Sequence, residues 1–255
     1  MVSFVRPPVA EVSLGRVFAG RSDLLVPHIG SFWSLVRDSY PKCQHAQLVL
    51  GEGEVPVQDQ FGNWLPRVWM IGLDDTWLVQ VQQDRLYVNW RAQKGGGPYP
   101  RFPAIKAEFD RVWTLFDRYV SEITGSGLQP HRIELAYTNI IPIGDGWTSV
   151  ADLDRVVRDF RWSPENRFLA PPENFASQTT FPMRSGDGKL TVQIGTVVRR
   201  NDGEVTAMRM ELRATGWPTG GRTSDEFVEE AHQHIVRGFE DLTTIEMHAN
   251  HWIRQ

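Results

Sequence analysis

The side chains best suited to binding chemistry alternate along one stretch of the chain, between residues 76 and 91. They carry amides, a phenol and a guanidinium, and they are Gln80, Gln82, Tyr87, Asn89 and Arg91. Amides donate and accept hydrogen bonds, and a guanidinium offers five donors in a rigid fork that suits a carboxylate or a phosphate. A face that is merely solvated more often carries Lys, Glu and Thr. This choice of residues predicts a polar network or a binding surface, and it names no reaction.

Further polar residues downstream could complete such a network. The candidates are Tyr99, Arg101, Glu134, Arg209, Glu211 and Arg213. If the polar face meets another part of the molecule, protein, water or a ligand must satisfy its donors and acceptors. We expect an internal structural network in which Arg91 pairs with Glu134 or Glu211. A ligand site or a protein-binding surface on the same face is the alternative.

Nucleic-acid binding is a further alternative for this region. It would use basic residues with aromatic side chains nearby, namely Arg91, Lys94, Arg101, Arg199 and Arg200. The formal net charge of the chain is -4, which argues against wholesale phosphate binding. Nucleic acid is therefore possible as a partner but is not favoured.

The histidines and the single cysteine form no convincing metal or catalytic site. His232 and His234 are two residues apart on a predicted helix, so they point to different faces. His248 and His251 could share a face, but zinc would still need a third ligand, for which Glu246 is the candidate, and no cysteine is near. Nothing fixes the geometry of Cys43 as a nucleophile, and the chain has no Gly-x-Ser-x-Gly motif. We expect no catalytic residue, no bound metal and no cofactor.

A β-hairpin must position the polar side chains between residues 76 and 91. Apolar residues alternate with them on both arms, as Trp77, Val79 and Val81 before residues 83–85 and as Leu86, Val88 and Trp90 after them. Strict period two over two arms, broken by a short polar turn, is typical of a hairpin. One face should be apolar and the other should carry the candidate site.

The same periodicity divides the rest of the chain into helices and strands. Helical spacing of apolar residues predicts helices over 27–40, 102–123 and 224–242, with a shorter one over 148–160. Strands are expected over 9–18, 47–50, 67–73, 132–141, 175–183, 190–198 and 205–214. The segment 51–64 is polar and rich in glycine, so it is expected to be a loop.

These elements follow the same order in the two halves of the chain: strand, helix, antiparallel strands, long helix. The order predicts an α+β fold made of a duplicated unit, with two antiparallel sheets each covered by a long helix. The halves would be residues 1–125 and 131–255, joined near Gly125 to Gly127 and packed tightly as one globular unit. Fusion of the two sheets into one curved sheet is the alternative.

Composition bounds the class of protein. The chain has 255 residues, of which 41% are hydrophobic, and this suits a soluble globular protein. No apolar run approaches the roughly 20 residues that a membrane span needs. The start of the chain lacks the features of a signal peptide. Cys43 is the only cysteine, so we expect a reducing cytoplasm, with no membrane partner. The oligomeric state is left open.

Five segments resemble a sporadically distributed, functionally uncharacterised bacterial family. They are the Pro-Pro-Val-x-Glu-Val start (Pro7–Val12), the Leu-x-Gln-x-Gln-x-Asp-Arg-x-x-x-Asn-Trp-Arg hairpin (Leu78–Arg91), the Tyr-Pro-Arg-Phe segment (Tyr99–Phe102), the Arg-Ile-x-Leu-x-Tyr-x-Asn strand (Arg132–Asn139) and a C-terminal helix with His, Phe and Trp (Ala231–Trp252). The resemblance brings no established activity. The patchy distribution of the family implies exchanged genes, such as mobile-element, toxin–antitoxin or phage-defence cassettes.

The leading hypothesis is a non-enzymatic binding or regulatory component of such a cassette, which acts through a protein partner encoded nearby. The first alternative is a small-molecule or nucleotide sensor, or a hydrolase, with its site on the polar hairpin face. The second is a nucleic-acid-binding accessory protein. A protein partner needs an exposed aromatic patch, whereas a ligand site needs a concave pocket with convergent polar groups.

Overall fold

The structure is a computed structural model, and it describes residues 2–51, 53–94, 96–163, 165–198 and 205–255. The chain divides into two compact units. We call Glu11–Leu135 the hairpin unit, and we call Ala136–Gln255 together with Met1–Ala10 the C-terminal unit. The predicted junction at Gly125 to Gly127 lies inside the hairpin unit.

The hairpin unit is built on antiparallel strands. Its elements are β1 (Val9–Phe18), α1 (Val26–Val36), β2 (Lys42–Ala46), β3 (Arg67–Ile71), β4 (Trp77–Gln82), β5 (Arg85–Arg91) and α2 (Phe102–Thr124). The predicted hairpin is present, because β4 pairs antiparallel with β5 through a turn at residues 83 and 84. On its other side β5 pairs with β1, and β4 pairs with β3.

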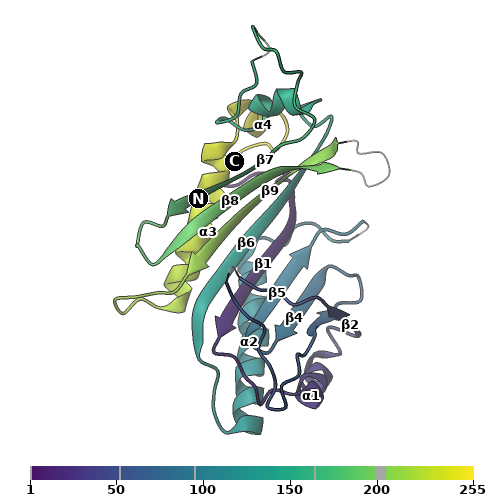
Figure 1. Cartoon of the computed structure of the whole chain (residues 1–255), viewed down its shortest axis with the longest axis vertical. Coiled ribbons are helices and arrows are strands. Elements are labelled where there is room, and N and C mark those ends of the chain that lie inside the picture. The colour runs from purple at the N-terminus through teal and green to yellow at the C-terminus, as the bar shows by residue number, and fades with distance from the viewer. Residues whose placement is uncertain (1, 52, 95, 164, 199–204) are drawn as a thin grey trace. The chain divides into compact units, whose positions relative to one another are not determined.

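The helix α2 covers the apolar face of these strands. Its stripe of Phe102, Ile105, Phe109, Val112 and Phe116 is buried, as the helical spacing predicts. The helix packs against β5, behind the strands in Figure 1. It ends where Gly125 adopts a left-handed conformation with φ 75°, which glycine takes without the cost that a Cβ brings. The burial of this stripe is the main apolar core of the hairpin unit.

The C-terminal unit also combines antiparallel strands with a long helix. Its elements are the greater part of β6 (Pro130–Pro142), a 3₁₀ helix (Val150–Arg155), β7 (Ala176–Pro182), β8 (Gly188–Val198), β9 (Val205–Gly216), α3 (Ser224–Leu242) and α4 (Ile245–Asn250). The helix α3 packs against β9 and β8 (Figure 1). A capping box between Thr223 and Glu226 starts it.

The first residues of the chain belong to the C-terminal unit. Phe4 is buried, and its ring lies 5.8 Å from that of Phe239 and 6.1 Å from that of Trp252. The backbone of Val5 donates a hydrogen bond to the carbonyl oxygen of Ile253. The unit is therefore discontinuous in sequence.

The prediction of two sheets, each covered by its own long helix, is wrong. The described strands form one nine-stranded sheet in the order β2-β3-β4-β5-β1-β6-β9-β8-β7. The physical reason lies in β1 and β6, which each have hydrogen-bonded neighbours on both sides. In two separate sheets these strands would leave edge N–H and C=O groups without partners. The fold is α+β only in the loose sense that helices accompany a large antiparallel sheet.

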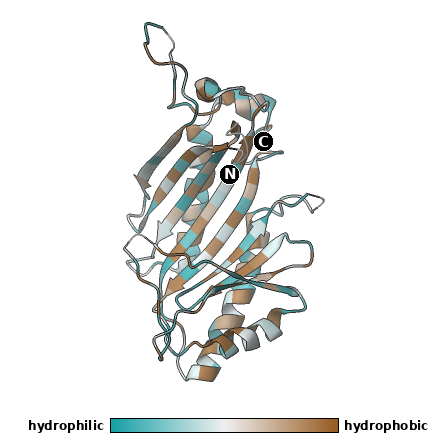
Figure 2. Ribbon diagram, turned by 45° about the vertical axis from the view of Figure 1, so that its right-hand side comes forward, coloured by the Kyte–Doolittle hydropathy of each residue, from teal (hydrophilic) through white to brown (hydrophobic). Residues whose placement is uncertain are grey.

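Local differences from the predicted elements have simple causes. The prediction of a strand over 47–50 is wrong, because the strand in this region is β2. The residues of β2 are mostly exposed, so they show no apolar alternation. The short helix predicted over 148–160 is a 3₁₀ helix of six residues. Elsewhere the strands carry the expected alternation of hydrophobic and hydrophilic residues (Figure 2).

Candidate functional site

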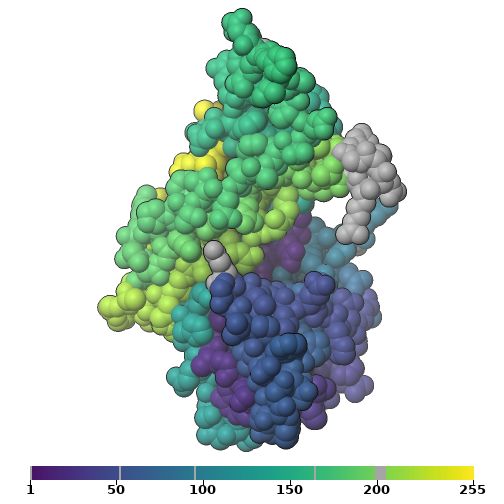
Figure 3. Space-filling view, in the orientation of Figure 1, coloured from purple at the N-terminus to yellow at the C-terminus, as the bar shows by residue number. Residues whose placement is uncertain are grey.

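A surface segment covers the polar face of the hairpin. We call residues 47–65, apart from residue 52, the strap. Its dark blue trace crosses in front of β4 and β5 in Figure 1, and its blue atoms lie at the surface in Figure 3. Val49 and Gln82 exchange two hydrogen bonds, of 2.9 Å and 3.1 Å, and these tie the start of the strap to β4. Gln82, on the face that the sequence singles out, is therefore covered by the strap.

Arg85 lies at the centre of the polar contacts under the strap. It is only 2% exposed. Its Nε and Nη2 donate to the two carboxylate oxygens of Asp84, at 3.0 Å and 2.6 Å, and Nη2 also donates to Glu54 at 2.5 Å. Burial lowers the pKa of Arg85, but the bonds to Asp84 and Glu54 outweigh it and the pKa is raised. A buried guanidinium is stable here because it is held by two carboxylates.

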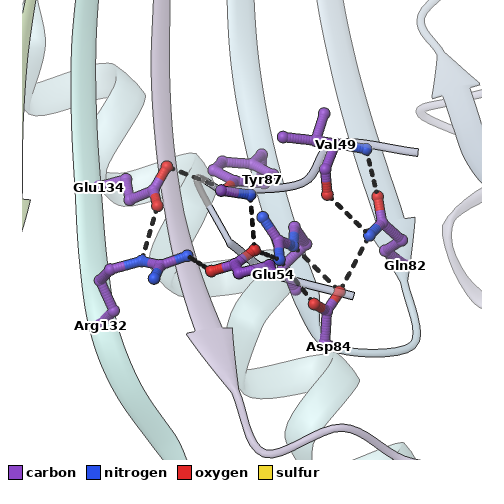
Figure 4. A network of polar contacts seen from close by, with 9 residues as sticks. Val49, Glu54, Gln82, Asp84, Tyr87, Arg132 and Glu134 are labelled. Atoms are coloured by element: carbon purple, nitrogen blue, oxygen red, sulfur yellow. Dashed lines mark hydrogen bonds and ion pairs between the residues drawn. The ribbon is translucent and has the colours of Figure 1, made fainter. Parts of the chain in front are cut away.

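Glu54 is the acid through which the strap joins the strands. It accepts hydrogen bonds from Arg85, from Arg132 at 2.7 Å and from the backbone N–H of Gly51 at 2.7 Å. Desolvation raises the pKa of Glu54, and these donors together bring it down to about 2. Glu54 is therefore ionised at neutral pH and acts as an anchor for two arginines (Figure 4).

Tyr87 and Glu134 extend the same set of contacts to β6. The Tyr87 hydroxyl donates to Glu134 at 3.0 Å, and Arg132 donates to Glu134 at 2.8 Å. We call Glu54, Asp84, Arg85, Arg132 and Glu134 the charge network (Figure 4). Gly15 lies opposite Tyr87 across the β1–β5 pair, and a Cβ at Gly15 would come within 2.0 Å of the tyrosine ring. Glycine, which has no Cβ, leaves room for the Tyr87 ring at this position.

A second group of polar contacts joins the other predicted hairpin residues. The Gln80 amide donates to Asn89 at 2.7 Å, and Asn89 donates to Glu11 at 2.5 Å. The Gln80 carbonyl accepts from Arg67 at 2.8 Å and from the Trp69 indole at 3.0 Å. Gln80 and Asn89 are 7% and 3% exposed, so their hydrogen bonds are made almost wholly to protein.

Three further candidate residues of the hairpin unit are Arg91, Tyr99 and Arg101. Arg91 donates to the backbone oxygen of Asp75 at 3.1 Å, and its guanidinium lies 5.7 Å from the centre of the Trp69 ring. The ring of Tyr99 packs on Trp90 at 5.2 Å. The guanidinium of Arg101 lies 5.6 Å from the centre of the Tyr99 ring. These contacts are made to aromatic rings and to a backbone oxygen. Among the contacts of the described residues, Arg91 does not pair with Glu134 or Glu211, so that prediction is wrong.

The remaining predicted site residues form their own cluster on β9 in the C-terminal unit. Glu211 is buried and accepts from Arg209 and, at 3.0 Å, from Arg213. This arrangement places one carboxylate between two half-exposed arginines along a single strand. For the alternative of nucleic-acid binding, Lys94 is exposed. Arg199 and Arg200 lie outside the described residues.

Sequence reasoning missed most of the charge network. Glu54 and Arg132 are separated by 78 residues, and local patterns carry no sign of such a contact. Asp84 and Arg85 fall in the polar segment 83–85 that the alternation predicts to be a turn, and a turn is expected to be solvated. The adjacent acid and base, Asp84 and Arg85, were the one local signal of a salt bridge.

The strap also displays apolar side chains. Phe61 is 73% exposed and Trp64 is 65% exposed. The turn that holds them is ordered by Asp59, whose carboxylate accepts from the backbone N–H of Phe61 at 2.9 Å and of Asn63 at 2.8 Å. Next to the turn, Gln60 donates its N–H to the carbonyl of Ser22 at 2.9 Å. The two aromatic rings therefore project from a turn that is fixed to the unit.

The acids and arginines of the charge network are paired with one another. Each carboxylate in it accepts a hydrogen bond from an arginine, and each arginine contacts a carboxylate. In the described part of the chain no group of three or more His, Cys, Asp or Glu is placed to hold a metal ion. None of the described helices has the length and apolar character required to cross a membrane.

Comparison with known proteins adds no assignment to this geometry. No protein-family model and no curated protein matches the chain.

Proposed function

We propose that the chain is a non-enzymatic binding component that acts through a protein partner, which contacts the strap. The observation that carries the proposal is the pair of exposed rings, Phe61 and Trp64, on a turn held in place by Asp59. Large aromatic side chains are enriched among the residues that dominate protein interfaces. The strap gives them little freedom to lose on binding, because Glu54 and Val49 tie it to the strands.

The contacts of the hairpin face favour this proposal over a small-molecule site on that face. Gln80, Gln82, Tyr87 and Asn89 are each at most 7% exposed, and each makes a hydrogen bond to protein. A ligand would have to displace the strap and break the pairing of Glu54 with Arg85 and Arg132. Opening these pairs takes one of two carboxylates from each arginine, at a cost of about 2 kcal/mol, which is below the roughly 3–5 kcal/mol for a fully buried pair because the Glu54 side chain is 26% exposed.

The resemblance to a sporadically distributed bacterial family supports the finer part of the proposal. In it, the protein works in the cytoplasm as a regulatory component of an exchanged gene cassette, and a neighbouring gene encodes its partner. A cassette of the phage-defence or toxin–antitoxin type is the setting that this distribution suggests.

A comparison of two matched double variants tests the proposal. The full-length chain with Phe61→Ala and Trp64→Ala should lose the partner that the unmodified chain retains when purified from the native host. With the purified product of the neighbouring gene, its affinity should fall by about 30-fold or more. Phe168→Ala with Leu169→Ala is the control, because these side chains are 102% and 68% exposed on another loop.

Both double variants should keep the unfolding free energy of the unmodified chain to within about 0.5 kcal/mol, since the side chains are exposed. Retention of the same partner by the Phe61→Ala, Trp64→Ala chain would contradict the proposal. So would equal loss of the partner in both double variants, because exposed apolar surface in general would then explain the capture.

A further inference from the structure

Three strands of the C-terminal unit, β7, β8 and β9, share a polar face that points away from α3. Leu190 of β8 and Leu212 of β9 are buried on the other side, where both lie next to Gly238 of α3. Successive side chains of a strand point to opposite faces of the sheet. The residues that alternate with these buried ones therefore lie on the face away from the helix.

The register of the strands sets the side chains of this face in rows. From one end to the other the rows are Pro182 with Lys189 and Thr215, Thr180 with Thr191 and Arg213, Gln178 with Gln193 and Glu211, and Ala176 with Gly195 and Arg209. None of these side chains is aromatic, and the uncharged ones are mostly threonine and glutamine. We call these residues the polar sheet face.

The polar sheet face is positively charged. It carries Lys189, Arg209 and Arg213 but one carboxylate, Glu211, to which both arginines bond. The Glu211 side chain is 9% exposed, whereas the side chains of Arg209 and Arg213 are 43% and 38% exposed. An anion that approaches this face therefore meets guanidinium groups before it meets the carboxylate.

The acids close to these strands in sequence do not cancel the charge. Among the described residues they are Asp187 and Glu173. Asp187, in the turn between β7 and β8, bonds to Arg222, so this pair adds no net charge. Glu173 is exposed in the loop before β7. Counted with Glu211, it still leaves the three cations of the face in excess, although the whole chain has a formal net charge of -4.

A hollow deepens the face at one end. It has a volume of about 510 Å³, and its lining includes Gln178, Gln193, Gly195 and Arg209. Gly195 has no side chain, so the row that ends at Arg209 is low at its centre. An oxyanion placed there has a guanidinium and two side-chain amides as hydrogen-bond donors.

These residue types favour a nucleic acid over an acidic protein as the occupant. Arginine, lysine, threonine and glutamine are among the side chains that contact phosphate and sugar groups. Interfaces with nucleic acid are more polar and more positively charged than interfaces between proteins, which depend on aromatic anchors. The polar sheet face has the polar donors and no aromatic ring. Because no ring can stack on an unpaired base, the face suits the backbone of a duplex.

We propose that the polar sheet face binds the phosphate backbone of a nucleic-acid duplex without reading its sequence. Lys189, Arg209 and Arg213 each contact a phosphate, and the threonine and glutamine side chains donate further hydrogen bonds. This site lies on different residues from the strap and goes beyond the function proposed above.

The test is fluorescence anisotropy of the full chain with a labelled DNA duplex. A duplex of about 20 base pairs is longer than the roughly 20 Å along the strands that separates the rows of Arg209 and Lys189. Contacts to three phosphates predict a slope of about -2.7 when log affinity is plotted against log salt concentration.

Lys189→Ala removes one exposed cation, so it should weaken binding about fivefold at about 50 mM salt and reduce the slope to about -1.8. Arg237→Ala is the matched control, because it removes an exposed cation from α3, on the other side of the sheet, and it should change neither quantity. Arg209→Gln should act as Lys189→Ala does, since Arg213 remains paired with Glu211. If Arg209→Gln impairs folding, the comparison of Lys189→Ala with Arg237→Ala still decides.

Four results would overturn the inference. They are no binding of the duplex at about 50 mM salt, the same slope for Lys189→Ala and Arg237→Ala, tighter binding of the single strand than of the duplex, and tighter binding of polyglutamate, which would indicate an acidic protein. The Phe61→Ala, Trp64→Ala chain should bind the duplex as the unmodified chain does. Failure at the strap and failure at the polar sheet face are thus separate outcomes.

Discussion

Single residues decide whether the strap stays on the strands, and Glu54 is the clearest case. Its carboxylate accepts hydrogen bonds from Arg85 and Arg132, and also from the backbone N–H of Gly51, which is itself part of the strap. The fully buried Arg85 depends on Glu54 and Asp84 for its charge to be compensated. Removal of one carboxylate therefore leaves a buried arginine N–H without an acceptor, because water does not reach it.

Glu54→Gln should destabilise the protein in a pH-dependent manner. At neutral pH we expect a loss of about 2 kcal/mol, below the roughly 3–5 kcal/mol for a fully buried pair, because the Glu54 side chain is 26% exposed. The pKa of Glu54 is about 2 in the folded chain, whereas an ordinary glutamate, as in the unfolded chain, has a pKa of 4.5. The folded form thus binds fewer protons in that window, and the stabilisation is complete above about pH 4.5 and disappears toward pH 2.

Urea unfolding of both chains across this range measures the effect. The difference between unmodified chain and Glu54→Gln should shrink as the pH falls. Glu122→Gln is the control, because Glu122 is 66% exposed and 3.8 Å from Arg118, so its cost should stay within about 0.5 kcal/mol throughout. A constant difference for Glu54→Gln down to the lowest pH would show that its charge does not hold the strap.

Gly15→Ala should displace Tyr87. The new Cβ would lie 2.0 Å from the ring, which is far inside contact distance, and the hydrogen bond to Glu134 would be strained or lost. We expect a cost of about 3 kcal/mol in the free energy of unfolding. Gly30→Ala has open space around its Cβ within α1 and should be neutral or stabilising by up to about 1 kcal/mol.

A double-mutant cycle identifies the cause of that loss. With Tyr87→Ala already in place, Gly15→Ala should cost much less than it does alone, because no ring remains to be displaced. Additive costs would mean that Gly15 matters for another reason.

At the scale of elements, periodicity was a good guide wherever one face of the element is buried. The hairpin β4–β5 and the helices α2 and α3 were all predicted from it. The edge strand β2 was missed because it is exposed on both faces and has no apolar alternation. The strap could not be predicted, because its conformation rests on contacts such as Glu54 with Arg132, which are distant in sequence.

The apolar stripe of α2 leads to a prediction at this scale. Phe116 is fully buried, and its ring lies 4.8 Å from that of Phe32 on α1 and 6.2 Å from that of Phe18 on β1. Phe116→Ala should cost roughly 3–5 kcal/mol through lost burial and the cavity left behind. Ile123→Ala on the same helix should cost less than about 1 kcal/mol, since Ile123 is 39% exposed. Urea denaturation compares the two, and similar costs would mean that the stripe is not the core.

At the scale of the whole molecule, local pattern could not give the number of sheets. Alternation shows which face of a strand is buried, but it does not show which strand lies beside it. β1 and β6 carry the same kind of alternation whether they end a small sheet or stand between two neighbours. Their hydrogen bonding on both sides is a long-range property, and it is the feature that makes one nine-stranded sheet.

The discontinuous C-terminal unit supplies the last prediction. Phe4 is far in sequence from the rest of that unit, yet it is 4% exposed and packs on Phe239, Trp252 and, at 5.2 Å, His248. If residues 1–10 are part of this core, Phe4→Ala should destabilise the C-terminal unit by roughly 3–5 kcal/mol, as removal of a buried phenylalanine does elsewhere.

Val5→Ala is the matched control for this prediction, because Val5 is the next residue and is 46% exposed. It should change the free energy of unfolding by no more than about 0.5 kcal/mol. Urea unfolding should be followed by near-ultraviolet circular dichroism as well as by fluorescence, because two compact units need not unfold together. If Phe4→Ala costs no more than Val5→Ala, the start of the chain only lies against the unit and is not part of its core.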